Sequence, residues 1–94
     1  SGGVDCSAFV RIIYLQYGGY DFGGDMIDVD FRNKGDAVSL EEAKAGDIVC
    51  YDGHVAIYDG NGMIVEAKGR LYGITHDRRA DSRRIITIRR IFDD

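Results

Sequence analysis

A dense apolar run near the start constrains the fold of this 94-residue chain more than any other feature. Only Arg11 and Gln16 are polar among residues 8–17, and the pair Gly18-Gly19 follows at once. The run is too long for an ordinary strand, and glycine is the usual residue just beyond a helix C-terminus. We therefore predict a largely buried helix with Asp5 near its N-cap, ending at the glycine pair.

Cys6 falls in the first turn of this predicted helix. The backbone N–H groups at a helix start have no partner within the helix, and together with the helix dipole they favour a negative charge. A cysteine placed there is expected to be partly thiolate, which is the reactive form of the side chain. Cys6 is therefore predicted to be a nucleophile, and a base must come from elsewhere in the chain.

Composition limits the class of protein. With 45% hydrophobic and 30% charged residues, the chain is typical of a globular domain. We predict one domain, residues 1–94, that lacks an N-terminal segment, because the sequence begins abruptly and without a signal peptide. No apolar run approaches the roughly 20 residues of a membrane span. A net charge of −4 argues against nucleic-acid binding. We expect the protein to be a monomer.

Three groups of residues suggest other sites, and each has a structural interpretation as well. Six arginines near the C-terminus indicate either a solvated strand edge or attraction to an anionic ligand; they are Arg78, Arg79, Arg83, Arg84, Arg89 and Arg90. Aspartates between residues 21 and 36 lack the glycine and terminal glutamate of a calcium loop, and no Cys/His spacing suggests zinc, so no metal or other cofactor is predicted. Cys50 could pair with Cys6, but its apolar surroundings favour an inert core residue.

The rest of the sequence is typical of a small antiparallel sheet. Residues 19–36 read as a long connection whose apolar residues enter the core, and residues 39–43 as a short helical turn capped by Ser39 and Glu42. Short apolar runs at 48–51, 54–58, 63–67, 71–75 and 85–92 are predicted strands, with turn signals at 52–53 and 59–62. One helix followed by about five strands indicates an α+β domain. The connection's apolar residues are Met26, Ile27, Val29 and Phe31.

His54 is the better of two candidate bases for Cys6. It opens a predicted strand directly after a glycine, where a side chain can face a cleft, whereas His76 has no such setting. A two-residue turn at 60–61 would place His54 opposite Ala67 and leave Glu66 one step away. A bulge or another loop class would bring Glu66 level with His54, where its carboxylate could orient the imidazole.

These residues carry a resemblance that each alone would not. The segments DCSAFV at 5–10, AGDIV at 45–49, GHVAIY at 53–58 and GNGMIVEA at 60–67 resemble the NlpC family of bacterial cell-wall peptidases. The resemblance implies a papain-like fold and cysteine peptidase activity on peptidoglycan stem peptides, at a γ-D-glutamyl–diamino acid bond. It implies catalytic roles for Cys6, His54 and Glu66. It also places Asp5 and Ser7 near the substrate's free N-terminal amine.

The sequence departs from the family pattern in two places. The third catalytic position is commonly histidine, sometimes asparagine or glutamine, and here it is Glu66; the familiar DCSG motif is DCSA. The family also has an upstream segment that usually carries a tyrosine beside the nucleophile, and we expect this chain to lack that segment. The implied substrate places the protein outside the cell or at the wall, of bacterial or phage origin. Two other functions stay open: an N-acetylmuramoyl-L-alanine amidase-type lysin, and a catalytically silent wall-binding module.

Overall fold

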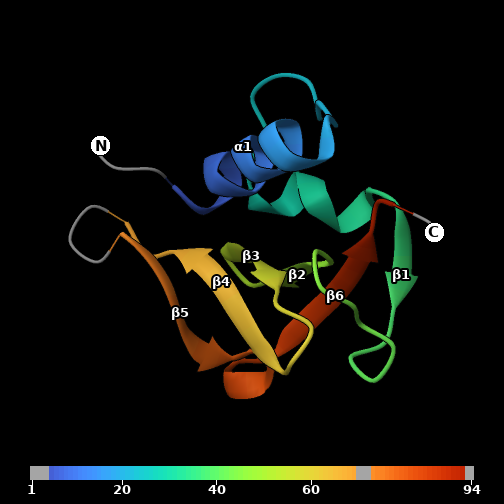
Figure 1. Ribbon diagram of the computed structural model, residues 1–94, viewed down its shortest axis with the longest axis vertical. Coiled ribbons are helices and arrows are strands. Elements are labelled where there is room, and N and C mark those ends of the chain that lie inside the picture. Colours follow the sequence, from blue (N-terminus) through green and yellow to red (C-terminus); the bar gives the residue numbers. More distant parts are fainter. Residues whose placement is uncertain (1–4, 70–72, 93–94) are drawn as a thin grey trace.

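The computed structural model describes residues 5–69 and 73–92, in which one helix packs on a curved antiparallel sheet (Figure 1). The sheet has six strands in the order β1-β6-β2-β3-β4-β5. This confirms the predicted α+β fold with one strand more than expected. The elements are α1 (Cys6–Gly18), η1 (Asp28–Asn33), β1 (Asp36–Val38), β2 (Ile48–Tyr51), β3 (His54–Tyr58), β4 (Met63–Ala67), β5 (Ile74–Arg79), η2 (Ala80–Ser82) and β6 (Ile85–Arg90).

Helix α1 begins and ends where its sequence signals predict. The Asp5 side chain accepts a hydrogen bond from the Ala8 N–H at 2.7 Å, and Gly19 closes the helix at φ 64. The expectation of a largely buried helix was wrong, because Tyr17 is 81% exposed and Leu15 is 52% exposed. The sheet covers only one face of α1, so apolar residues on the opposite face remain in contact with solvent.

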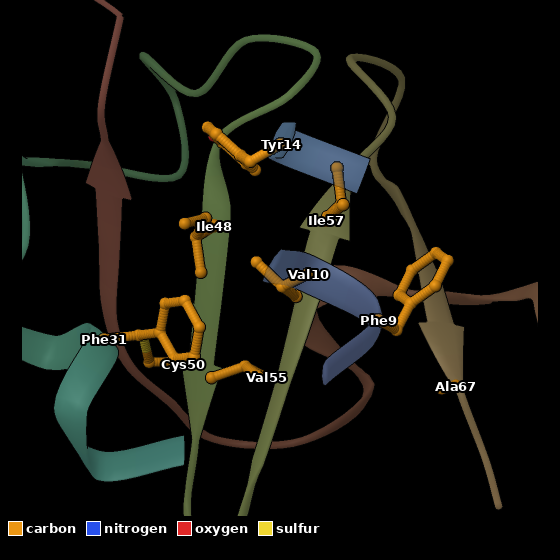
Figure 2. Close-up of a cluster of buried hydrophobic side chains, with 9 residues drawn as sticks. All are labelled: Phe9, Val10, Tyr14, Phe31, Ile48, Cys50, Val55, Ile57 and Ala67. Carbon is orange, nitrogen blue, oxygen red and sulfur yellow. The ribbon is translucent and has the colours of Figure 1, made fainter. Parts of the chain in front are cut away.

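The main core lies between α1 and the sheet (Figure 2). Cys50 is fully buried within it, and burial raises the pKa of this thiol to about 11. Both cysteines are free, which excludes the disulfide and fits the prediction of Cys50 as a core residue. The core residues are Phe9, Val10, Tyr14, Phe31, Ile48, Cys50, Val55, Ile57 and Ala67.

A second cluster fills the opposite face of the sheet. It includes Tyr51, Tyr58 and Ile64, and Ala80 of η2 packs against them. Strands β2 and β3 are therefore buried on both faces, which explains why their sequences are continuous apolar runs instead of alternating ones. None of the helices in the described part of the chain is long and apolar enough to cross a membrane.

The connection after α1 differs from its prediction. Phe31 of η1 is fully buried and Met26 packs against the core, but Ile27 and Val29 are 59% and 41% exposed. Two of the aspartates cap local structure: Asp21 accepts from the Gly23 N–H at 2.8 Å, and Asp30 accepts from the Ile27 N–H at 2.9 Å. No group of three or more possible metal ligands occurs within residues 5–69 and 73–92.

The predicted turn at residues 39–43 and the two predicted strands at 71–75 and 85–92 agree with the structure in part. Ser39 and Glu42 form the reciprocal hydrogen bonds of a helix cap, but they close a turn and no helix follows. The strand predicted at 71–75 overlaps the start of β5, and its first two residues lie outside the described ranges. The last strand ends at Arg90, two residues earlier than predicted.

Candidate active site

The start of α1 meets the start of β3 and the end of β4 at a single pocket of about 420 Å³. Cys6 and His54 both line it, although they are 48 positions apart in the sequence. Cys6 is partly exposed, unlike the buried Cys50. The fold therefore gives the predicted nucleophile and the predicted base a shared, solvent-accessible space. The lining residues are Asp5, Cys6, His54, Ala67, Lys68, Gly69 and Arg78.

The imidazole of His54 is held through one of its two nitrogens. Its Nε2 lies 2.8 Å from Oε1 of Glu66. An ionised carboxylate only accepts hydrogen bonds, so Nε2 carries the proton and Nδ1 keeps a lone pair. In the described ranges no hydrogen bond occupies Nδ1. The ring is thus in the tautomer that can accept a proton from a group in the pocket.

The surroundings of His54 favour its neutral form. Burial lowers the pKa of the imidazole, the hydrogen bond and charge of Glu66 raise it, and the charges of Arg83 and Arg78 lower it. The net effect is a pKa below the ordinary value of 6.5. A neutral imidazole at neutral pH is the form that a general base requires.

Glu66 is a fully buried carboxylate. Burial alone would raise its pKa, but hydrogen bonds from Arg78 and His54 outweigh that effect and lower it. Arg78 donates from Nε to Oε2 at 2.8 Å and from Nη2 to Oε1 at 2.6 Å. Both carboxylate oxygens are therefore occupied, and Glu66 stays ionised between two partners.

The register between β3 and β4 differs by one residue from the two-residue-turn alternative. Ile57 pairs with Val65 and Tyr58 with Ile64, which puts Glu66 on the same sheet face as His54. The connecting loop is longer than a two-residue turn: the Asp59 N–H donates to the Met63 carbonyl at 2.9 Å. Continued by one pair, this register puts Glu66 level with Ala56 and not with His54 as expected, and the Glu66 side chain reaches the imidazole diagonally on the shared sheet face.

Asp5 and Ser7 occupy different positions relative to the pocket. Asp5 lines it, and its Oδ1 accepts from the Ala8 N–H and from the Ser7 hydroxyl at 3.1 Å. Ser7 is only 6% exposed and does not belong to the residues found lining the pocket. Asp5 therefore lies at the pocket, and Ser7 contacts it through a hydrogen bond to Oδ1.

His76 lies away from this pocket. Its Nε2 is 2.7 Å from Oδ2 of Asp59, at the loop between β3 and β4, and its side chain is 55% exposed. Of the two histidines, only His54 shares a pocket with Cys6.

Sequence reasoning missed two neighbours of the imidazole, Tyr51 and Arg78. Tyr51 pairs with His54 across the Asp52-Gly53 turn, and that turn could have identified it. Arg78 was grouped with the C-terminal arginines. Four other arginines of that group bind acidic side chains or backbone carbonyls of the chain: Arg79 binds Asp81, Arg83 the Asp52 carbonyl, Arg89 two carbonyls and Arg90 Asp47.

Comparison with known proteins identifies the family of this chain. The sequence model of the NlpC/P60 family matches residues 1–88. The chain belongs to the NlpC/P60 family. It is 44% identical over 66 residues to the peptidoglycan DL-endopeptidase CwlO of Bacillus licheniformis, covering 65% of this chain and 14% of that protein. It is 37% identical over 79 residues to the peptidoglycan endopeptidase RipB of Mycobacterium tuberculosis, covering 78% and 31%.

Solved structures extend the likeness to the fold. The NlpC/p60 domain of the peptidoglycan hydrolase SagA superposes with a TM-score of 0.72 at 29% identity, covering 92% of this chain and 75% of that one. RipB superposes with a TM-score of 0.76 at 31% identity, covering 96% and 46%. These likenesses confirm the papain-like α+β fold. The chain spans less than a third of the length of the curated relatives it matches.

Proposed function

We propose that this chain is the catalytic domain of a cysteine endopeptidase that hydrolyses peptidoglycan stem peptides, at the bond between γ-D-glutamate and a diamino acid. The supporting observation is the pocket shared by Cys6 and His54, with Nε2 of His54 bound to Glu66. Relatives named as peptidoglycan endopeptidases support the substrate class. Such a substrate implies that the protein acts outside the cell or at the wall.

In the proposed first half-reaction, Nδ1 of His54 takes the proton of the Cys6 thiol, and the sulfur attacks the carbonyl carbon of the scissile amide. The oxyanion forms next to the backbone N–H of Cys6, which has no partner within the helix because it belongs to the first turn. The C–N bond then breaks. The imidazolium gives its proton to the departing amine, which leaves the acyl group on Cys6 as a thioester.

Water completes the reaction. Nδ1 accepts one proton from the water as its oxygen attacks the thioester carbon. The C–S bond breaks, the sulfur leaves as thiolate and recovers a proton from the imidazolium, and the carboxylic acid product departs. Glu66 stabilises the imidazolium in both halves because its carboxylate contacts Nε2–H.

Asp5 supplies the proposed contact to the substrate's free amine. One carboxylate oxygen, Oδ1, is used by the helix cap and by Ser7. The other oxygen, Oδ2, accepts no hydrogen bond from the described residues, so an ammonium group in the pocket could bind to Oδ2. Ser7 would then help indirectly, by fixing the orientation of Asp5.

Digestion of purified muropeptides tests this proposal. The parent should release a product with a new free amine on the diamino acid, identified by mass spectrometry, and Cys6→Ala should abolish it. Cys50→Ala is the matched control and should retain cleavage, since Cys50 is buried in the core. Cleavage by Cys6→Ala contradicts the mechanism. Free N-acetylmuramoyl ends indicate an amidase instead, and an inactive parent that binds muropeptides indicates a binding module.

Thiol labelling gives an independent check without a substrate. Iodoacetamide at neutral pH should modify Cys6 rapidly and leave Cys50 unmodified, because Cys6 is partly exposed and Cys50 is not. Peptide mapping separates the two sites within one sample. Equal or slower labelling of Cys6 would contradict its role as the nucleophile.

A further inference from the structure

Glu66 lies between two partners, and only one of them belongs to the proposed reaction. On one side its Oε1 contacts Nε2 of His54 at 2.8 Å. On the other, Arg78 binds both carboxylate oxygens, at 2.6 Å and 2.8 Å. Glu66 has no exposed surface, whereas Arg78 is 34% exposed at the pocket. The three side chains form a continuous row from β3 through β4 to β5.

An irregularity in β5 creates this contact. Ile64 pairs with Arg78 and Glu66 pairs with Thr75, so two residues of β5, His76 and Asp77, lie opposite one residue of β4. In a regular ladder continued from the Glu66–Thr75 pair, the residue opposite Ile64 would be Asp77. The bulge moves Arg78 onto the sheet face of Glu66 instead, beside the neighbouring strand β4 (Figure 1).

We infer that Arg78 is a positioning residue of this site: it fixes the buried Glu66 carboxylate so that His54 is held as the Nε2–H tautomer, which leaves the Nδ1 lone pair for the proton of Cys6. The inference depends on the proposed function only in the experiments that measure enzymatic activity. A two-point contact fixes the plane of a carboxylate, because the guanidinium fork matches both oxygens. Oε1, which Nη2 of Arg78 also contacts, is thereby held 2.8 Å from Nε2 of His54.

The charge of Arg78 matters as much as its geometry. A buried carboxylate with no cationic partner takes up a proton readily, because burial disfavours its charged form. A protonated Glu66 could donate to Nε2 instead of accepting from it. The imidazole would then carry its proton on Nδ1 and could not take one from the Cys6 thiol. Arg78 prevents this change by lowering the pKa of Glu66.

Several other groups face the imidazole and must stay unchanged in any test. Arg83 contributes a second positive charge, and Tyr51 stacks on the ring. The charged and titratable groups around His54 are Glu66 on β4, Arg78 on β5, Arg83 after η2, Tyr51 on β2, and Asp5, Cys6 and Lys68 at the pocket.

Nitrogen-15 NMR of the His54 imidazole tests the inference without any substrate. The parent should show the Nε2–H tautomer at neutral pH, and Arg78→Met should show a larger Nδ1–H fraction that grows as the pH falls. The matched control is Arg79→Met, because Arg79 is the next residue of β5 and, among the residues that the structure describes, forms an ion pair with the exposed Asp81 alone. An Arg78→Met spectrum identical to the parent's would overturn the inference, whatever the enzymatic activity.

Muropeptide kinetics provide the second test. Arg78→Met should lower kcat by about 10- to 100-fold, the range seen when residues that orient metal ligands are removed, with a smaller change in KM. Arg78→Lys should recover part of the loss because it restores the charge without the fork. Arg79→Met should match the parent.

A double variant separates positioning from substrate binding. Glu66→Gln places a neutral carbonyl oxygen beside Nε2, and this oxygen accepts a hydrogen bond without a cationic partner. Glu66→Gln combined with Arg78→Met should therefore recover the part of the lost activity that depends on the tautomer, but not the part that depends on the carboxylate charge beside the imidazolium. Thermal unfolding should show the double variant to be more stable than Arg78→Met. No recovery, with the loss confined to KM, would show that Arg78 binds substrate and would overturn the inference. An inactive parent would instead reject the proposed function, and the NMR result would still decide the role of Arg78.

Discussion

Tyr51 and His54 stack across the tight turn between β2 and β3, with ring centroids 5.9 Å apart and planes inclined by 27°. The Arg83 guanidinium also lies over the Tyr51 ring, 5.3 Å from its centroid. The tyrosine hydroxyl donates to the Ala80 carbonyl at 2.6 Å. Burial raises the pKa of Tyr51 to about 12, so it stays a neutral donor. The ring therefore supports the imidazole on a fixed, buried platform.

Two substitutions at Tyr51 should separate folding from orientation. Tyr51→Phe keeps the ring and leaves the buried Ala80 carbonyl without this donor, so it should cost about 1–2 kcal/mol in unfolding free energy with little change in kcat. Tyr51→Leu removes the stacked ring and should lower kcat as well. Urea unfolding and muropeptide kinetics measure the two effects. If both variants lower kcat equally, stacking does not orient His54.

The pH dependence of stability should reflect the lowered pKa of His54. A histidine whose pKa is lower in the folded state disfavours protonation there, so the unfolded chain binds more protons as the pH drops. Its contribution is fully present above pH 6.5, the ordinary pKa, and is lost as the pH falls through the folded value. Glu66, whose pKa is also lowered, adds a second loss in the more acidic range.

His54→Gln tests this expectation. Melting temperatures of the parent and of His54→Gln should differ in slope between pH 7 and about pH 5, with the parent losing more on acidification. His76 is present in both proteins, so its contribution cancels in the comparison. Parallel curves would show that His54 does not titrate differently in the folded and unfolded states.

Local signals in the sequence were sufficient to predict where Cys6 and His54 lie, but not which residues contact the imidazole and its partner. The bounds of α1 follow from Asp5 and the glycine pair, and the place of His54 follows from the Asp52-Gly53 turn, because caps and tight turns depend on adjacent residues. The Glu66 contact depended on the loop class between β3 and β4, which the residues left open. Arg78 could not be predicted, because a single bulge in β5 decides which side chain faces Glu66.

The exposed face of α1 shows a second limit of the sequence pattern. Ile12 and Leu15 are as apolar as Val10, yet they are 43% and 52% exposed while Val10 is fully buried. Hydrophobic density predicts that a helix forms, but the number of partners that cover it is a property of the whole fold. The sheet covers the face of α1 that carries Val10 and leaves Ile12 and Leu15 partly exposed to solvent.

Asp5 should have separable roles in folding and in substrate binding. Asp5→Ala removes the acceptor of the Ala8 N–H and should cost about 1 kcal/mol in unfolding free energy. Asp5→Asn keeps an acceptor oxygen and removes the charge, so its stability should stay close to the parent's. Under the proposed function, Asp5→Asn should raise KM for stem peptides with a free N-terminal amine.

Acetylated peptides supply the control for that prediction. Acetylation removes the positive charge that Asp5 is proposed to bind, so parent and Asp5→Asn should cleave the acetylated substrate with similar kcat/KM. A loss of equal size on free and acetylated peptides would mean that Asp5 acts through the helix cap alone.

The edge pairing of β1 with β6 should depend on the absence of a side chain at Gly35. Gly35 has φ +57, and a Cβ there would lie 2.1 Å from the backbone carbonyl oxygen of Arg90. Gly19 has a similar φ of +64 but no atom within 4 Å of the corresponding position. Alanine at Gly19 should therefore cost about 1–2 kcal/mol from the left-handed conformation alone.

Gly35→Ala carries the same conformational cost and a steric clash with backbone. Because the carbonyl belongs to the last residue of β6, relief of the clash must separate β1 from β6, at a further cost of about 1–3 kcal/mol. Urea unfolding of both variants measures the difference. Hydrogen exchange should show faster exchange of the β6 amides that face β1 in Gly35→Ala only. Equal destabilisation by the two substitutions would show that the β1 edge moves aside without loss of pairing.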